Sequence, residues 1–351
     1  MLGYRAVVAV WLVAACGSVQ HAAGDAASGG SADAPAADAS SLSGWLYTDG
    51  GTIYVHDGTG GGTRWMGRGV NLDDIFLCGY NNTLYLASPD ATLETIAAGL
   101  VADWKPTFVR ISLGMASYTT QTSWLAGDAQ YKTPMTAVID ALGANPGVYV
   151  LVTLRSDATM TGQDTSDGDP EATGLPSPST DAVYTALVDT FATSPFVLFG
   201  LSNEPGGNKL TSAQIAAAMS HAVGTIRAEE DRLGVPHHLV SVQGNDWTSD
   251  ISGYAAAPLP ADNVVYEVHG YPPATASYTY ANIPVILGEY GSLADSASFY
   301  ADVEAKQVPN LAWDFEPYSD CSPDLLTVTT SATDLVPTAW GTTVKAYLNA
   351  H

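Results

Sequence analysis

Two glutamates, Glu204 and Glu289, each follow a short apolar run of the sequence. Glu204 stands in Asn203-Glu204-Pro205 after the run 196–201, and Glu289 follows the run 285–287. Parallel strands present their carboxyl ends at one edge of a sheet, so two such glutamates can face each other. A protonated carboxyl group beside a carboxylate is the pair that cleaves a glycosidic bond. One glutamate alone would usually be a solvated or ion-paired surface residue, but the pair favours this chemistry.

Other polar and aromatic residues fall within further apolar runs or at their ends. The positive charge of Arg110 would keep Glu289 ionised, and the anion of Glu289 would favour a proton on Glu204. His269 and Tyr271 are two positions apart, so an extended strand turns both side chains to one face. A tryptophan ring offers a flat apolar face to a sugar. The remaining candidates for substrate contact are Asn71, Trp247 and Trp313.

Apolar runs that suit buried parallel strands alternate with helical stretches from residue 65 onward. The runs cover residues 65–70, 108–113, 148–154, 196–201, 239–243, 264–268, 285–287 and 311–315. Two helix starts are marked, by Thr133 before Pro134 and by a capping box of Thr211 with Gln214. The helical stretches cover residues 91–104, 134 onward, 181–193, 215–233, 294–306 and 338–349, with shorter intervals after the fifth and sixth runs.

Eight strand–helix units in roughly 300 residues predict an α/β fold, a (β/α)8 TIM barrel, because such a barrel takes about 250 residues. A doubly wound open sheet is the alternative, but no glycine-rich phosphate turn follows the first run. Segments 53–55 and 63–65, joined by a glycine-rich turn, predict a β-hairpin before the barrel.

Together these motifs resemble glycoside hydrolase family 5, the cellulase family within the clan of retaining (β/α)8 glycosidases. The resemblance covers roughly residues 45–351 and is carried by Arg68-Gly69-Val70-Asn71, Val109-Arg110, Asn203-Glu204-Pro205, His269-Gly270-Tyr271, Gly288-Glu289-Tyr290 and Trp313. It implies that Glu204 is the general acid/base, that Glu289 is the nucleophile, and that Asn203 binds the sugar 2-hydroxyl. Family members often have a histidine after the third strand, where this chain has Arg155. A guanidinium can donate to sugar hydroxyls but does not titrate near neutral pH, so this departure bears on substrate preference.

We therefore expect an exported retaining glycosidase that cleaves β-linked oligo- or polysaccharide by double displacement, and we favour an endo-β-1,4-glucanase. A β-mannanase, a mannosidase or a xyloglucanase on the same framework is the alternative among enzymes. A non-catalytic carbohydrate-binding barrel on the cell surface is the alternative from another class. Catalysis by two carboxyl groups requires no cofactor, and we expect a monomer.

The amino-terminal segment predicts export. Residues 1–15 combine Arg5 with an apolar run too short to span a bilayer, which is typical of a signal peptide. Val13-Ala14-Ala15 before Cys16 resembles a bacterial lipobox, which implies acylation of Cys16; an ordinary signal peptide cleaved after a later alanine is the alternative. Residues 16–44 are mostly Ala, Gly, Ser and Asp, which predicts a flexible linker before a catalytic domain at 45–351. We expect a cell-surface lipoprotein, touching the membrane only through its lipid, or a secreted protein.

Composition excludes several other classes of protein. With 12 Lys and Arg against 36 Asp and Glu, the net charge of −24 repels nucleic acid. A content of 8 Trp and 18 Tyr supplies too much apolar surface for a fully disordered chain. A polytopic membrane protein is excluded because the long apolar run is confined to the amino terminus.

Two loops carry further predictions. Cys78 follows the first strand and Cys321 the eighth, which are neighbours in a closed barrel, so an exported chain would join them in a disulfide. Asp164, Asp167 and Asp169 follow the third strand, and their oxygens could hold Ca²⁺. Their spacing does not match an EF-hand loop, and we favour a solvated acidic loop without metal.

Overall fold

A computed structural model of the chain describes residues 42–73, 89–114, 124, 131–155, 174–178, 180–206, 210–271, 277–315, 324–327 and 335–351. All of these belong to one compact unit, residues 37–351. The predictions for the signal peptide, for Cys16, for Cys78 with Cys321, and for the acidic loop at Asp164, Asp167 and Asp169 lie outside the described residues. Within the described ranges, no helix has the length and apolarity needed to cross a membrane.

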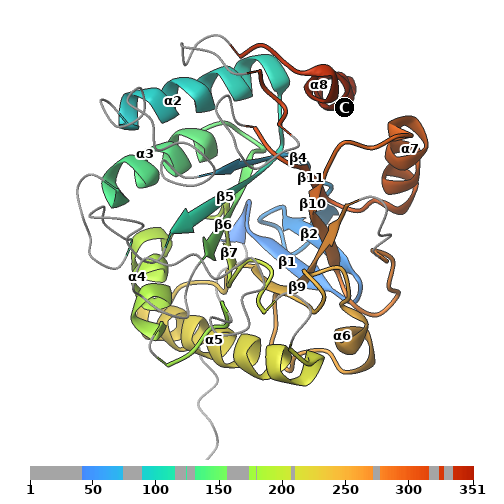
Figure 1. The fold of residues 1–351 in the computed structure, drawn as a ribbon. Helices are drawn as coiled ribbons and strands as arrows, with labels where there is room; N and C mark the ends of the chain where they lie inside the picture. Colours follow the sequence, from blue (N-terminus) through green and yellow to red (C-terminus); the bar gives the residue numbers. More distant parts are fainter. Residues whose placement is uncertain are drawn as a thin grey trace, which may run out of the picture. The chain divides into compact units, whose positions relative to one another are not determined.

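Eight parallel strands form a closed barrel (Figure 1). They are β4 (Arg68–Asp73), β5 (Phe108–Gly114), β6 (Tyr149–Arg155), β7 (Val197–Gly200), β8 (Val240–Gln243), β9 (Val264–Gly270), β10 (Val285–Tyr290) and β11 (Asn310–Ala312). Each strand pairs with the next in parallel, and β11 pairs with β4 to close the ring. The predicted (β/α)8 barrel is confirmed. Its first strand begins at Arg68 rather than at Trp65, because Trp65 packs in the base of the barrel.

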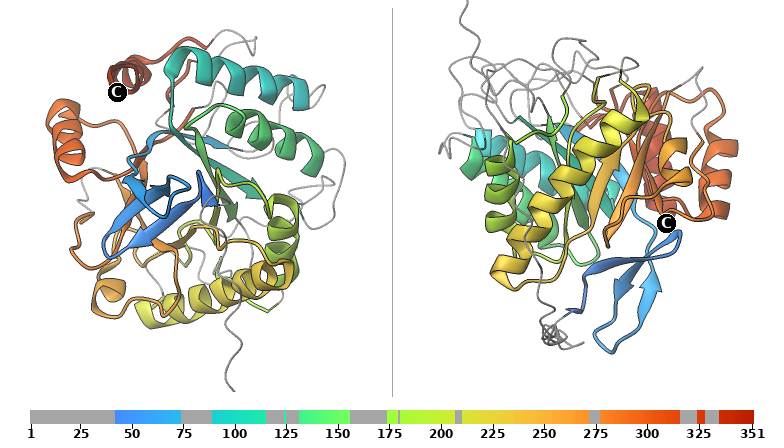
Figure 2. Two further views of the ribbon diagram at one scale, coloured as in Figure 1. Left: turned by 180° about the vertical axis from the view of Figure 1, so that it is seen from behind. Right: turned by 90° about the horizontal axis from the view of Figure 1, so that it is seen from below.

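Helices surround the barrel on its outside (Figures 1 and 2). They are α2 (Pro89–Gly99) with its π-helical continuation η2 (Leu100–Trp104), α3 (Lys132–Gly143), α4 (Asp181–Phe191), α5 (Ser212–Leu233), α6 (Ser252–Ala256), α7 (Ser296–Lys306) and α8 (Ala339–Ala350). The capping box that opens α5 is confirmed, because Thr211 accepts from the Gln214 N–H and the Gln214 side chain accepts from the Thr211 N–H.

The predicted start of α3 is wrong by two residues. Its N-cap is Tyr131, so Thr133 lies inside the first turn and does not cap the helix. N–H groups in the first turn have no intrahelical partner, so Pro134 fits there without costing a hydrogen bond. The helix can therefore begin before the threonine–proline pair.

A small antiparallel sheet closes one end of the barrel (Figure 2, right). It consists of β1 (Leu46–Asp49), β2 (Thr52–His56) and β3 (Gly62–Arg64), so the predicted hairpin is present and has one additional strand. Leu46 and Ile53 pack with Trp65 against residues at the amino ends of the barrel strands, such as Phe108 and Leu151. That end is filled by apolar side chains, so the functional side chains gather at the opposite, carboxyl end.

The interior of the barrel becomes polar above this base. Arg110, Thr153, Ser241 and Glu267 are all fully buried. Neighbouring strands bring them into contact: Nε of Arg110 on β5 donates to Oγ1 of Thr153 on β6, and Ser241 on β8 donates to Glu267 on β9. Barrel interiors are usually filled by branched apolar residues. A buried polar layer is therefore unusual, and the candidate site lies above it.

Candidate active site

Glu204 and Glu289 meet at the carboxyl end of the barrel, as the sequence predicted. Glu204 lies in the loop after β7, and Glu289 is the next-to-last residue of β10. One carboxylate oxygen of each, together with a ring nitrogen of His269, lies within 4.8 Å of the others. Carboxyl groups of retaining glycosidases stand about 5–5.5 Å apart, whereas inverting enzymes separate them by about 6.5–9.5 Å to admit a water. The spacing here suits direct attack by one carboxylate.

Arg110 orders the floor of this site. Its Nη1 donates to Oε1 of Glu289 at 2.7 Å and to Oδ1 of Asn71 at 3.0 Å, and its Nη2 donates to Oδ1 of Asn203 at 2.5 Å. The guanidinium is fully buried, and Asn71 in turn donates to the carbonyl oxygen of Gly288 at 3.0 Å. The predicted contact between Arg110 and Glu289 is therefore present, and Arg110 also fixes the amide of Asn203.

Tyr271 completes the surroundings of Glu289. Its hydroxyl donates to Oε2 of Glu289 at 2.9 Å, so the two oxygens of that carboxylate are held from different sides. Burial and the nearby Glu289 anion raise the pKa of Tyr271 well above its usual value, which keeps the hydroxyl protonated. His269 and Tyr271 both face Glu289, which agrees with their spacing of two in an extended strand.

His269 connects the two glutamates. Its Nδ1 lies 2.7 Å from Oε1 of Glu204 and 3.4 Å from Oε2 of Glu289, while its Nε2 lies 3.0 Å from Oε1 of Glu267. Burial lowers the pKa of His269, but Glu289, Glu204 and Glu267 together raise it to about 9. The ring is thus surrounded by carboxylates on both of its nitrogens.

The backbone of Glu204 is held in an uncommon conformation. Its φ is +45°, and its N–H donates to Oε1 of Gln243 at 2.5 Å. Thr248 donates to the same Gln243 oxygen at 3.0 Å, and its carbonyl accepts from the His269 N–H at 3.1 Å. The loop after β8 therefore fixes both Glu204 and His269. Non-glycine residues at positive φ persist where the surrounding structure determines them, often at functional sites.

The three remaining predicted contacts are placed as follows. Trp313 comes directly after β11 and is 7% exposed, with its backbone held by Tyr290 and Trp340. Trp247 lies in the loop after β8 and is 42% exposed, which leaves much of its ring open to solvent. Arg155 is the last residue of β6, and its side chain is outside the described part of the structure.

Glu267, Gln243 and Thr248 take part in this network but were not among the predicted site residues. A signal for Glu267 exists in the sequence: it is a charged residue inside an apolar strand, two positions before His269 and hence on the same face. Gln243 and Thr248 carry no comparable signal, because their role comes from contacts with distant parts of the chain.

Metal binding is a separate question for this cluster. In the described part of the chain, Glu204, His269 and Glu289 are the group whose donor atoms approach closely enough to be considered. These side chains already bond to one another, and Arg110 contacts Glu289 at 2.7 Å. A guanidinium at that distance opposes a cation, so we assign no metal to the site.

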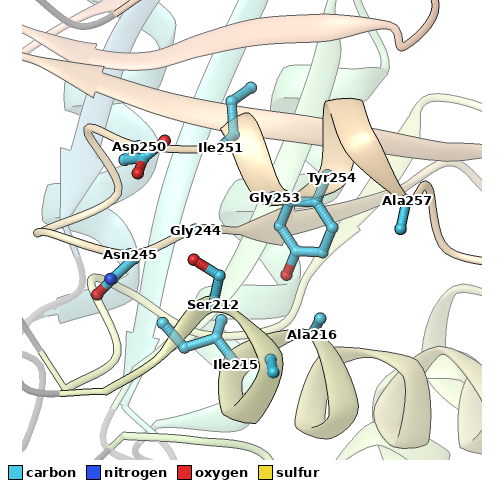
Figure 3. Close-up of a pocket in the computed structure, with 11 residues that line it drawn as sticks. Ser212, Ile215, Ala216, Gly244, Asn245, Asp250, Ile251, Gly253, Tyr254 and Ala257 are labelled. Carbon is cyan, nitrogen blue, oxygen red and sulfur yellow. The ribbon is translucent and has the colours of Figure 1, made fainter.

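A separate pocket of about 290 Å³ lies on the outer side of the barrel, between α5 and α6 (Figure 3). Ile215 and Ala216 from α5 face Ile251 and Tyr254 from the α6 segment across it. The Tyr254 hydroxyl donates to the backbone oxygen of Gln243 at 2.9 Å. None of the paired glutamates lines this pocket, so it is distinct from the candidate active site.

A (β/α)8 barrel whose carboxyl end brings together two carboxylates, one of them held by arginine and tyrosine, defines a site of the glycosidase class. The family model described as cellulase, glycosyl hydrolase family 5, matches residues 69–319 of this sequence. The chain belongs to glycosyl hydrolase family 5, a family of retaining glycoside hydrolases. The predicted resemblance is confirmed.

Individual relatives are distant. Endoglucanase N from Pectobacterium atrosepticum is 24% identical over 169 residues, which cover 48% of this chain but 33% of that protein. The chain thus spans about a third of the length of this curated relative. An endoglucanase catalytic domain from Thermobifida fusca in complex with cellotetraose superposes with a TM-score of 0.64 at 20% identity, covering 87% of this chain and 97% of that one. A β-mannanase from Streptomyces thermolilacinus with mannohexaose gives a TM-score of 0.64 at 20% identity, covering 88% and 96%.

Proposed function

We propose that this protein is a retaining β-glycoside hydrolase in which Glu204 is the general acid/base and Glu289 is the nucleophile. The observation that carries the proposal is the approach of one oxygen from each carboxylate to within 4.8 Å. That separation matches a double displacement, in which the sugar ring is bonded directly to the second carboxylate.

In the first step, Glu289 attacks the anomeric carbon while Glu204 gives its proton to the departing oxygen. Arg110 and Tyr271 hold the two oxygens of Glu289 at 2.7 and 2.9 Å, so the attacking carboxylate is oriented before substrate arrives. Asn203 would bind the 2-hydroxyl of the same sugar, because its amide is fixed by Arg110.

In the second step, water attacks the anomeric carbon of the glycosyl-enzyme and releases Glu289. Glu204, now a carboxylate, takes a proton from that water. Because the same carbon is attacked twice from opposite faces, the product keeps the anomeric configuration of the substrate.

For the substrate we propose a β-1,4-linked glucan attacked within the chain. The supporting observations are the endoglucanase relatives and the fold shared with an enzyme that binds cellotetraose. A β-mannan is the second candidate, favoured by the equally similar β-mannanase with mannohexaose. Trp247, with its exposed ring, is the proposed platform for a sugar beside the cleaved bond.

The test is hydrolysis of carboxymethylcellulose, mannan and xyloglucan, with product lengths recorded over time. We expect cleavage of the glucan, with internal cuts that shorten the polymer early in the reaction. Glu289→Gln should abolish turnover while oligosaccharide binding persists, since glutamine keeps the shape of glutamate without its charge. A wild-type protein that binds glycans but cleaves none of them, nor any aryl β-glycoside, would be a carbohydrate-binding barrel instead.

We propose also that the chain is exported and acylated at Cys16. The support is the signal-like segment 1–15 and the small residues before Cys16. Expression in a bacterial host should place the protein in the membrane fraction, and Cys16→Ser should release it.

Intact mass of the denatured, non-reduced protein tests the proposed bridge between Cys78 and Cys321: two free thiols would disprove it.

A further inference from the structure

Glu267 is a buried carboxylate beside the active site that the two-glutamate mechanism leaves unused. It lies inside β9 and is fully buried. Oε1 is 3.1 Å from Nε of Arg110 and 3.0 Å from Nε2 of His269, and Oε2 accepts from the Ser241 hydroxyl at 2.6 Å. A buried charge is costly unless it is compensated, so these partners must hold Glu267 as an anion.

The neighbouring strand makes room for this carboxylate. A Cβ atom on Gly288 would lie 2.1 Å from Oε1 of Glu267, which no real contact allows. The register between β9 and β10 also shifts between Leu287 and Glu289. Glycine at position 288, the residue before Glu289, therefore leaves the space that the Glu267 carboxylate occupies.

His269 stands between this carboxylate and Glu204. Its Nε2 faces Glu267 at 3.0 Å, and its Nδ1 faces Glu204 at 2.7 Å and Glu289 at 3.4 Å. Arg110, Tyr271 and Gln243 are the further charged, titratable or polar groups around this set. A hydrogen-bonded carboxylate fixes which nitrogen of a histidine carries its proton. Glu267 thus keeps a proton on Nε2 and turns Nδ1 toward Glu204.

We propose that Glu267 is a positioning residue which, through His269, holds the proton that Glu204 donates to the leaving group. This inference rests on the proposed roles of Glu204 and Glu289. Nε2 keeps its own proton beside Glu267, and one further proton is shared between Nδ1 of His269 and the carboxyl group of Glu204. The pair can hold this proton into the alkaline range, because Glu267 stabilises the positively charged ring.

The proton count balances through both steps. When Glu289 attacks, the bond from the anomeric carbon to the leaving oxygen breaks, and that oxygen takes the electron pair and the shared proton. Glu204 is then a carboxylate beside a neutral imidazole that is still protonated on Nε2. When water attacks, the bond to Glu289 breaks, and the water proton returns to the position between Glu204 and His269.

The variant Glu267→Gln keeps the size of the side chain and removes its charge. The test measures kcat/KM of wild type and Glu267→Gln against pH with two substrates. Phenyl β-cellobioside has a leaving group that needs a proton, and 2,4-dinitrophenyl β-cellobioside has one that does not. The corresponding mannobiosides replace them if the polysaccharide assay identifies a mannanase. For the phenyl substrate the alkaline limb should move down by about one pH unit or more, with at least a tenfold loss at pH 8. For the dinitrophenyl substrate, and for both substrates near pH 5, we expect less than a threefold change.

Glu230→Gln is the matched control. Glu230 is also fully buried between a histidine and an arginine, at 2.7 Å from Nδ1 of His238 and 2.6 Å from Nη1 of Arg227. These residues precede β8, at the end of the barrel away from Glu204, so the control should not move the alkaline limb. A Glu267→Gln variant that loses the same fraction of activity at every pH and with both substrates would overturn the proposal.

A second measurement uses the wild-type protein and does not depend on activity. Nitrogen NMR of the 7 histidines, with His269 assigned by its loss in His269→Gln, reports the charge of this ring directly. We expect a ring that carries a proton on Nε2 at pH 7.5, with Nδ1 hydrogen-bonded to the proton shared with Glu204, and a ring without a proton on Nε2 at that pH would overturn the inference even if the Gln variant does not fold. If the protein cleaves no glycan at all, the proposed function fails while the NMR result still decides the role of Glu267.

Discussion

Replacing Arg110 with methionine removes the guanidinium that joins two buried carboxylates. Arg110 lies 3.1 Å from Glu267 and 2.7 Å from Glu289, and its side chain is fully buried. Methionine fills a similar volume but offers neither charge nor hydrogen-bond donors. The variant therefore leaves two carboxylates in the barrel interior with no arginine beside them.

The size of the effect follows from Glu267. Burial would raise the pKa of Glu267, but Arg110 and His269 outweigh burial and lower it from 4.5 to about 2. By linkage, this difference corresponds to about 3 kcal/mol of stability at pH 7. Breaking a buried ion pair by removing one partner typically costs about 3–5 kcal/mol, so we expect a loss of that order and a urea midpoint lower by about 1 M.

The loss should depend on pH in a defined direction. A carboxyl group with a lowered folded-state pKa stabilises the protein above its unfolded value of 4.5, and this contribution disappears as the pH falls toward about 2. Without Arg110 the largest cause that opposes burial is gone, so the pKa of Glu267 is lowered less and the variant gains less stability than the wild type as the pH rises. The gap between wild type and variant should widen by about 1 kcal/mol from pH 4 to pH 7.

The assay is urea unfolding followed by circular dichroism at both pH values, with Arg68→Met as the matched control. Arg68 also donates from two nitrogens to a glutamate: its Nε lies 2.6 Å from Oε1 of Glu304 and its Nη2 lies 2.7 Å from Oε2. The side chain of Arg68 is, however, 18% exposed. Partly exposed pairs contribute about 1 kcal/mol or less. Equal losses in Arg68→Met and Arg110→Met, or a gap that does not grow with pH, would refute this reasoning.

Three further variants test other parts of the site, and a fourth is a control outside it. Tyr271→Phe removes the 2.9 Å hydrogen bond to Glu289, so kcat on an aryl β-glycoside should fall about tenfold with little change in the urea midpoint; an unchanged kcat would show that Tyr271 does not assist Glu289. Trp247→Ala deletes an exposed ring, so KM for tetrasaccharides should rise about three- to tenfold while KM for an aryl glycoside stays constant, and equal changes would contradict a stacking role. Gly288→Ala places a Cβ atom 2.1 Å from Glu267 and should reduce kcat/KM at least tenfold, whereas Gly224→Ala, in the open on α5, should keep activity and add about 0.5–1 kcal/mol of stability.

The barrel could be predicted because its strands are buried on both faces. Such strands are continuous apolar runs, so the segments around Val109, Leu151 and Val265 stand out from the amphipathic helices between them. Helix ends were harder to predict. Thr211 marks the start of α5 correctly because its capping box is local, whereas Thr133 does not mark the start of α3, since a proline is equally at home inside the first turn.

Much of the site could also be predicted, because a barrel places the ends of its strands together. That rule alone brings Glu204, Glu289 and Tyr271 to one mouth. The layer beneath them was not predicted. Glu267 reaches Arg110 across the width of the barrel, and such a contact depends on strand tilt and register, which no spacing in the sequence encodes.

The loop after β8 shows a similar limit. Positive φ values occur at three consecutive residues of this loop, Asp246, Trp247 and Thr248. Thr248 thereby contacts Gln243 and His269, while Trp247 faces solvent. Three consecutive left-handed residues without glycine cannot be expected from local preference. Their conformation is set by contacts with β8 and β9, and these are visible once the strands are in place.

The central claim is that Glu289 forms a covalent bond to the sugar while Glu204 handles the proton. The most direct measurement is mass spectrometry of the wild-type protein after reaction with 2,4-dinitrophenyl 2-deoxy-2-fluoro-β-cellobioside, whose fluorine slows release of the glycosyl-enzyme. We predict that one fluorinated disaccharide is attached to the peptide that contains Glu289, and that Glu289→Gln gains none. A label on any other residue, or turnover that yields the inverted anomer without a labelled enzyme, would contradict the account.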